Sequence, residues 1–99
     1  MAGKQIIWST LAQEELLAIL EFYALQNGNS NYSIKLLGEI EDLASTISRN
    51  ELIGRLCSNK FTRMIPILSY IIFYEINYEK IEIISIWDNR QNPGKRKVK

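Results

Sequence analysis

The spacing of apolar residues in the first half of the chain predicts two helices. The first helix has an apolar stripe at three- and four-residue intervals, formed by Leu16, Ile19, Leu20 and Tyr23. Thr10 and Gln13 have the spacing of a capping box and predict where this helix begins. Gly28 predicts where it ends, because glycine readily adopts the left-handed conformation that follows a helix.

The second helix is predicted from about residue 31 to residue 48. Its apolar stripe consists of Leu36, Ile40, Leu43 and Ile47. Because only the short polar run 26–30 separates the two helices, we expect them to form an antiparallel helical hairpin.

The rest of the chain has the pattern of β-strands. A short strand is predicted at 4–8, and three more are predicted at the ranges 60–65, 69–76 and 81–87. The tight connection 77–80 makes the last two strands an antiparallel hairpin. The prediction is a β-α-α-β-β-β, α+β fold with the helical hairpin packed on one face of a small, mainly antiparallel sheet. We expect one domain, 1–94, and a basic C-terminal tail, 95–99.

The strand at 69–76 is apolar on both faces. Alternation places Tyr70, Ile72, Tyr74 and Ile76 on one face and Ile71, Phe73 and Glu75 on the other. Two helices can cover only one face of the sheet. We therefore expect a protein partner on the second face, with coverage by the chain's own loops and tail as the alternative.

Symmetric pairing about the 77–80 turn places two carboxylates opposite each other. The predicted cross-strand pairs are Ile76–Ile81, Glu75–Glu82, Phe73–Ile84 and Ile71–Ile86. Facing carboxylates destabilise a sheet unless a cation lies between them. Arg63, Lys60 or an arginine of a partner could supply the cation; a register shifted by one residue, or solvated side chains at a strand end, would also explain the pair.

Composition and charge exclude several classes of protein. The 99 residues contain 12 Lys and Arg, 11 Asp and Glu, no histidine and one cysteine, Cys57, so one chain cannot assemble a zinc or haem site or a histidine-dependent catalytic triad. We expect no cofactor and no metal. We also expect no leader peptide, no membrane segment and a cytoplasmic location.

Charge is unevenly distributed along the chain. Residues 1–50 contain three basic and six acidic residues (net −3), whereas residues 51–99 contain nine and five (net +4). The basic residues Arg55, Lys60, Arg63 and Arg90, with the tail, would suit RNA or an acidic peptide; a solvated surface is the alternative.

Several segments together resemble one known family. The first helix ends in Phe22-Tyr23 and an Asn-Gly turn follows it; Gly54-Arg55 precedes a strand that bears Arg63. The run Tyr70-Ile71-Ile72-Phe73-Tyr74-Glu75-Ile76 and the segment Ile86-Trp87-Asp88-Asn89-Arg90-Gln91-Asn92-Pro93 complete the pattern. Over nearly its whole length the chain resembles the RelE/ParE superfamily of toxins from bacterial type II toxin–antitoxin modules.

The resemblance implies a small growth-inhibiting toxin that a cognate antitoxin neutralises. We expect the antitoxin on the second sheet face, at Ile71, Phe73, Glu75, Glu82 and Ile84. One branch of the superfamily cleaves messenger RNA on the ribosome, and the other poisons DNA gyrase without being a nuclease.

The residues favour the gyrase branch. Ile71 stands where the nuclease branch has an arginine, and the C-terminal end lacks the usual aromatic residue or histidine. The alternatives are a metal-independent, ribosome-dependent nuclease and a degenerate member that only binds antitoxin. A nuclease would use Lys60, Arg63 and Arg90 as cations, with Tyr70 or Glu82 for proton transfer.

Overall fold

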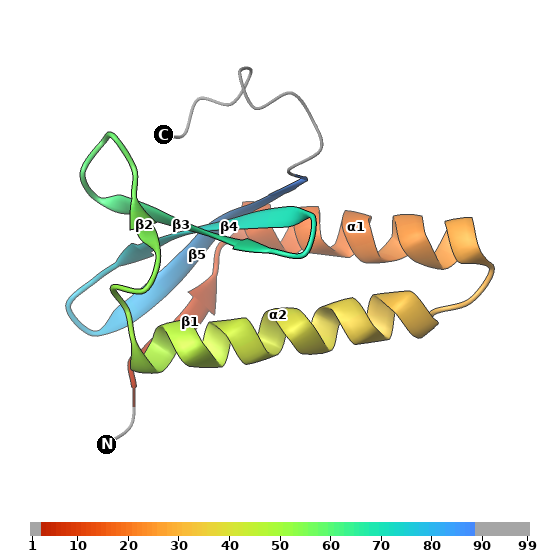
Figure 1. The fold of residues 1–99 in the computed structure, drawn as a ribbon, viewed down its shortest axis with the longest axis horizontal. Helices are drawn as coiled ribbons and strands as arrows, with labels where there is room; N and C mark the ends of the chain where they lie inside the picture. Colours follow the sequence, from red (N-terminus) through yellow and green to blue (C-terminus); the bar gives the residue numbers. More distant parts are fainter. Residues whose placement is uncertain (1–2, 89–99) are drawn as a thin grey trace.

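The structure is a computed structural model that describes residues 3–88. Its elements are β1 (Gln5–Trp8), α1 (Thr10–Asn27), α2 (Asn31–Arg49), β2 (Arg55–Leu56), β3 (Thr62–Ile67), β4 (Tyr70–Ile76) and β5 (Lys80–Asp88). Figure 1 shows α1 and α2 side by side, with the turn between them lying well beyond the strands. Among residues 3–88, no helix is long and apolar enough to cross a membrane.

The strands form one five-stranded sheet in the order β1-β5-β4-β3-β2. β1 pairs with β5 in parallel, and the other three pairings are antiparallel. The predicted α+β fold and its mainly antiparallel sheet are confirmed. β2 was not predicted, because a strand of two residues is too short to show alternation.

The first helix begins one residue earlier than the capping-box spacing predicted. Ser9, not Thr10, is the N-cap: its hydroxyl accepts a hydrogen bond from the backbone N–H of Ala12 at 3.0 Å. The side chain of Gln13 donates to the carbonyl of Trp8 at 2.9 Å. The other end of α1 is as predicted, with Gly28 in the left-handed conformation at φ 73°.

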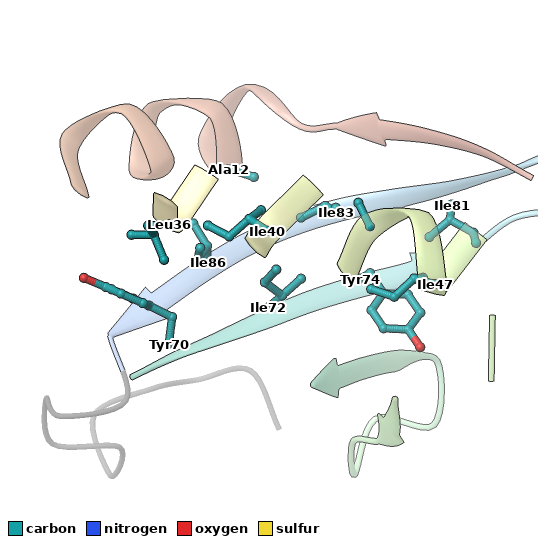
Figure 2. Close-up of a cluster of buried hydrophobic side chains, with 11 residues drawn as sticks. Ala12, Leu36, Ile40, Ile47, Tyr70, Ile72, Tyr74, Ile81, Ile83 and Ile86 are labelled. Carbon is teal, nitrogen blue, oxygen red and sulfur yellow. The ribbon is translucent and has the colours of Figure 1, made fainter. Parts of the chain in front are cut away.

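The main core lies between the helical hairpin and one face of the sheet. Its fully buried members include Leu36, Ile40 and Ile47 of α2, Tyr70, Ile72 and Tyr74 of β4, and Ile81, Ile83 and Ile86 of β5 (Figure 2). The predicted α2 stripe is confirmed at Leu36, Ile40 and Ile47, and Leu43 packs half-buried beside them. This face of the sheet is the one predicted to receive the helices.

The β4–β5 register follows the prediction near the turn and departs from it further along. Ile76 pairs with Ile81 and Glu75 with Glu82, as expected. A bulge then intervenes, so that Phe73 pairs with Ser85 and Ile71 with Trp87. The predicted pairs Phe73–Ile84 and Ile71–Ile86 are therefore wrong, because Ile84 is an extra residue in β5.

A second, smaller apolar cluster occupies the opposite face of the sheet. Phe73 is only 2% exposed and Ile71 is also buried, with Cys57 beside them. The residues packed around this cluster are Met64, Ile84 and Trp87. Ile71 and Phe73 are thus buried within the chain itself, so the alternative to a partner, coverage by the chain's own residues, holds for the middle of the second face.

Candidate functional site

The facing carboxylates of Glu75 and Glu82 lie on the second face of the sheet. Glu75 Oε2 accepts a hydrogen bond from the Thr62 hydroxyl at 2.9 Å, and that hydroxyl accepts one from Asn59 Nδ2 at 2.8 Å. Within residues 3–88, Lys4 forms an ion pair with Glu51 at 2.9 Å. Neither glutamate of the facing pair forms an ion pair with a described residue. Among the described residues, Glu75 is thus partnered by a neutral hydroxyl and not by a cation.

Arg63 does not supply the cation, because it lies on the other face. It pairs with Tyr74, and residues directly opposite each other in an antiparallel sheet share a face. Its Nη1 donates to the carbonyl of Gly54 at 2.7 Å and weakly to that of Leu52 at 3.4 Å. The guanidinium thus holds the segment that joins α2 to β2.

Tyr74 fixes the same segment from the core side. Its buried hydroxyl accepts a hydrogen bond from the Gly54 N–H and donates one to the carbonyl of Glu51, both at 2.8 Å. A Cβ at residue 54 would lie 2.6 Å from that hydroxyl, so the position requires glycine. Burial raises the pKa of Tyr74, and Glu51 adds to this; the Gly54 N–H and the charge of Arg63 oppose it.

Lys60 lies in the β2–β3 turn and not at the start of the strand predicted at 60–65. Its backbone is left-handed, with φ 77°, and its side chain is exposed. The turn is held by Asn59, whose Oδ1 accepts from the N–H groups of Phe61 and Thr62. The side chain of Lys60 is therefore solvated, whereas the guanidinium of Arg63 donates hydrogen bonds to backbone carbonyls.

The two residues offered for proton transfer, Tyr70 and Glu82, lie on opposite faces of the sheet. Tyr70, offered for proton transfer, is buried in the main core, whereas Glu82 is half-buried on the second face. Arg90 and the 95–99 tail lie outside the described residues. Within residues 3–88, no three Asp, Glu or Cys side chains converge in a way that could hold a metal ion.

The five residues expected to bind a partner do share the second face. Ile71 and Phe73 form its buried centre, and Glu75, Glu82 and Ile84 are half-buried around them. Partner binding at these positions stays a prediction.

A further surface with exposed apolar side chains lies on α1, and it was not predicted. Large apolar side chains are exposed on α1: Leu11, Leu17, Phe22 and Leu25. The signal was present in the sequence, since Leu11, Ala18, Phe22 and Leu25 are spaced by seven, four and three residues.

Comparison with known proteins identifies the family of this domain. A family model described as "ParE toxin of type II toxin-antitoxin system, parDE" matches residues 6–93. This chain belongs to the ParE toxin family. It is therefore the toxin component of a type II toxin–antitoxin module.

The structural comparison agrees on the fold of this ParE-family toxin. A solved structure of the chromosomal ParDE TA system from P. aeruginosa superposes with a TM-score of 0.72 at 18% sequence identity. The match covers 86% of this chain and 95% of that chain. A search of curated proteins finds no match.

Proposed function

We propose that this ParE-family toxin acts by binding DNA gyrase, without cleaving RNA, and that a cognate antitoxin holds it inactive. Family membership supports the toxin role, and the resemblance described above links the ParE branch to gyrase. The position of Arg63 is the observation that favours binding over nuclease chemistry.

RNA cleavage without a metal needs free cations around the phosphate that is attacked. Arg63 is the only arginine within the predicted strand 60–65, and its guanidinium donates to the carbonyls of Gly54 and Leu52. Using it for phosphate would leave the Gly54 carbonyl without this partner. Its contacts therefore favour a structural role.

The test uses purified toxin in two assays. We expect it to inhibit DNA supercoiling by purified gyrase and to leave translation of ready-made messenger RNA undisturbed. Translation from supplied mRNA does not depend on gyrase, so the two targets are separated. Translational arrest with cuts in the message would overturn the proposal, and protein that affects neither assay would identify a degenerate member.

A pair of arginine variants tests the role of Arg63 directly. We expect Arg63→Ala to lower the thermal midpoint and to reduce gyrase inhibition only as far as the folded fraction falls. Arg55→Ala, at an exposed arginine of β2, is the matched control and should leave both unchanged. Loss of activity in fully folded Arg63→Ala protein would instead assign Arg63 to the functional site.

The second sheet face is proposed as one contact surface of the antitoxin. Its half-buried rim of Glu75, Glu82 and Ile84 is accessible beside the buried Ile71 and Phe73. We expect Ile84→Glu to weaken antitoxin binding, because it places a charge within an apolar contact. Unchanged affinity for the antitoxin would remove this face from the interface.

A further inference from the structure

The two edges of the sheet differ in how far the chain itself protects them. β1 forms one edge, and the chain covers both of its ends. The N–H of Lys4 donates to the carbonyl of Ser48 at 3.1 Å. The carbonyl of Trp8 accepts a hydrogen bond from the side chain of Gln13 at 2.9 Å. β2 forms the other edge, and none of the described strands lies beyond it. An edge strand of this kind offers its backbone to any chain that can pair with it.

Leu56 directs its backbone groups outward at the β2 edge. The N–H of Cys57 donates to the carbonyl of Thr62 at 2.7 Å, so residue 57 is bonded toward β3. In an antiparallel pair, residues whose backbone groups face the neighbouring strand alternate with residues whose groups face away. Leu56 is therefore a residue whose N–H and carbonyl face away from β3. These two groups are placed to pair with an added strand.

Large apolar side chains lie around this edge, at the end of the molecule opposite the α1–α2 turn (Figure 1). Leu56 is 43% exposed, Phe61 in the β2–β3 turn is 63% exposed, and Leu52 in the α2–β2 connection is 62% exposed. Leu56 lies opposite Arg63, whose guanidinium reaches the carbonyl of Leu52. Phe61 precedes Arg63 by two residues, and strand alternation puts it on the same face. We call Leu52, Leu56 and Phe61 the β2 edge surface.

Hydrogen bonds hold the β2 edge surface in one shape. Asn59 Oδ1 accepts from the N–H groups of Phe61 at 3.0 Å and of Thr62 at 2.9 Å, which fixes the turn. The buried hydroxyl of Tyr74, through its two backbone hydrogen bonds, holds the connection that carries Leu52. A surface that is ordered in advance loses little conformational entropy when a partner binds. The exposed apolar residues are thus prepared for contact and not left over from a loose loop.

The charge around the β2 edge surface limits its occupant. Residues 55–63 contain three basic side chains and no acidic one. Lys60 is exposed in the turn directly before Phe61. A second copy that paired through the same edge would bring like charges together, which is unfavourable. A segment of another protein that carries carboxylates beside apolar side chains is complementary.

Of the two proposed partners, the antitoxin fits this edge less well than gyrase does. The proposed antitoxin surface includes Glu75 and Glu82, which attract cations and not carboxylates. Thr62 connects that surface to the β2 edge: its hydroxyl donates to Glu75 Oε2 at 2.9 Å, while its N–H belongs to the turn that Asn59 fixes. An antitoxin bound over Glu75 would therefore lie beside the β2 edge surface and hinder a second partner there.

We propose that this toxin binds gyrase through the β2 edge surface. An extended acidic segment of gyrase pairs with the backbone of Leu56 as an added strand. Its apolar side chains contact Leu52 and Phe61, and a carboxylate lies beside Lys60. The inference rests on the gyrase target proposed above and adds the contact surface to it. It also accounts for neutralisation, because the antitoxin and gyrase would occupy neighbouring surfaces.

Inhibition of supercoiling by purified gyrase tests the added strand. Leu56→Pro removes the outward N–H and keeps the pairing with β3, because proline is tolerated on an edge strand where its N–H would face solvent. We expect the concentration for half-maximal inhibition to rise by about tenfold or more. Leu56→Ala shortens the same side chain but keeps the N–H, so its rise should stay below about threefold. Equal values for the two variants would show that no strand is added and would overturn the proposal.

Two further variants test the side chains. Lys60→Glu places a carboxylate against an acidic partner, and Phe61→Ser removes an apolar contact; we expect each to raise the inhibitory concentration by about tenfold. The matched controls are Lys35→Glu, at an exposed lysine of α2, and Tyr78→Ser, at a side chain 92% exposed in the β4–β5 turn. Both controls should inhibit like the native chain. Circular dichroism and the thermal midpoint verify that every variant is folded. If the controls lose as much activity as the edge variants, the inference is wrong.

The same assay separates this inference from the proposed target. Native toxin that does not inhibit gyrase would overturn both. Native inhibition that every edge variant retains would overturn this inference alone. Binding of the purified antitoxin, measured by titration calorimetry on the same variants, should weaken by less than about threefold. Lost antitoxin affinity, or lost self-association in sedimentation, with unchanged gyrase inhibition would assign the edge to the antitoxin or to a second copy and overturn the proposal.

Discussion

The carboxylate of Glu15 accepts the backbone hydrogen bond of Ile86 that a neighbouring strand would otherwise accept. β1 ends at Trp8, opposite Ile83, so β5 continues beyond its neighbour in the sheet. There Glu15 Oε1 accepts the N–H of Ile86 at 3.0 Å, together with the hydroxyl of Ser85. A side chain of the helix that follows β1 thus completes the hydrogen bonding at this edge, where an unpaired buried N–H would destabilise the fold.

Replacing Glu15 should destabilise the domain. We expect Glu15→Ala to lower the free energy of unfolding by about 1.5–3 kcal/mol, the usual range for hydrogen bonds to a charged group. Glu14→Ala, at the exposed neighbouring position, should change it by less than about 0.5 kcal/mol. Urea denaturation measures both. Equal effects at the two positions would show that the contact with Ile86 contributes little.

The hydroxyl of Tyr74 should stabilise the fold through its hydrogen bonds to two backbone groups. Tyr74→Phe leaves the Gly54 N–H and the Glu51 carbonyl without this partner, at a buried site. We expect a loss of about 1–3 kcal/mol in the free energy of unfolding. Tyr78→Phe is the control, since its side chain is almost fully exposed and should show no measurable change. A neutral result for Tyr74→Phe would mean that water replaces the hydroxyl.

The same tyrosine should make stability fall at alkaline pH. Burial raises the pKa of Tyr74 above its ordinary value of 10.0. Above pH 10 the unfolded chain therefore loses the phenolic proton before the folded chain does, and stability decreases as the pH rises further. We expect this decrease to be shallower in Tyr74→Phe than in the native chain, in urea titrations between pH 9 and 11. Parallel curves would contradict a raised pKa.

Local patterns predicted the helices, the main strands and the end of the β4–β5 hairpin near its turn. The bulge at Ile84 was not predicted, although the adjacent apolar residues Ile83 and Ile84 interrupt the alternation of β5. The predicted register assumed that side chains alternate strictly between the two faces along the whole of β5, including Ile83 and Ile84. Every pair beyond it was consequently wrong by one residue.

The hydrogen-bond partners of individual polar side chains could not be predicted from the spacing of residues along the chain. Arg63 reaches the carbonyl of Gly54, and Tyr74 reaches Glu51 and Gly54, only because the segment after α2 folds back over β3 and β4. Sequence alternation indicates the face on which a side chain lies. It does not indicate which loop will meet it there, and so Arg63 was offered as one possible cation for the facing carboxylates or for a phosphate.

Cys57 should react slowly with thiol reagents in the folded protein. It is buried against Ile71 and Phe73, and burial raises the pKa of its thiol. Because the thiolate is the reactive form, both effects slow the reaction. We expect labelling by a disulfide reagent at pH 8 to be much faster in urea than in native buffer. Equal rates would show that the second-face cluster opens readily.

Leu68 is held in an unfavourable backbone conformation in the β3–β4 turn. Ile67 pairs with Tyr70, which leaves a two-residue turn, and Leu68 at its first position has φ 54° with an exposed side chain. Glycine has no Cβ and adopts a positive φ without strain, and it is the preferred first residue of a two-residue turn in which only that residue has a positive φ. We expect Leu68→Gly to raise the free energy of unfolding by up to about 1 kcal/mol. Leu56→Gly, at an exposed leucine of β2 without a positive φ, should lower it, so that a gain at both positions would instead reflect the removal of exposed apolar surface.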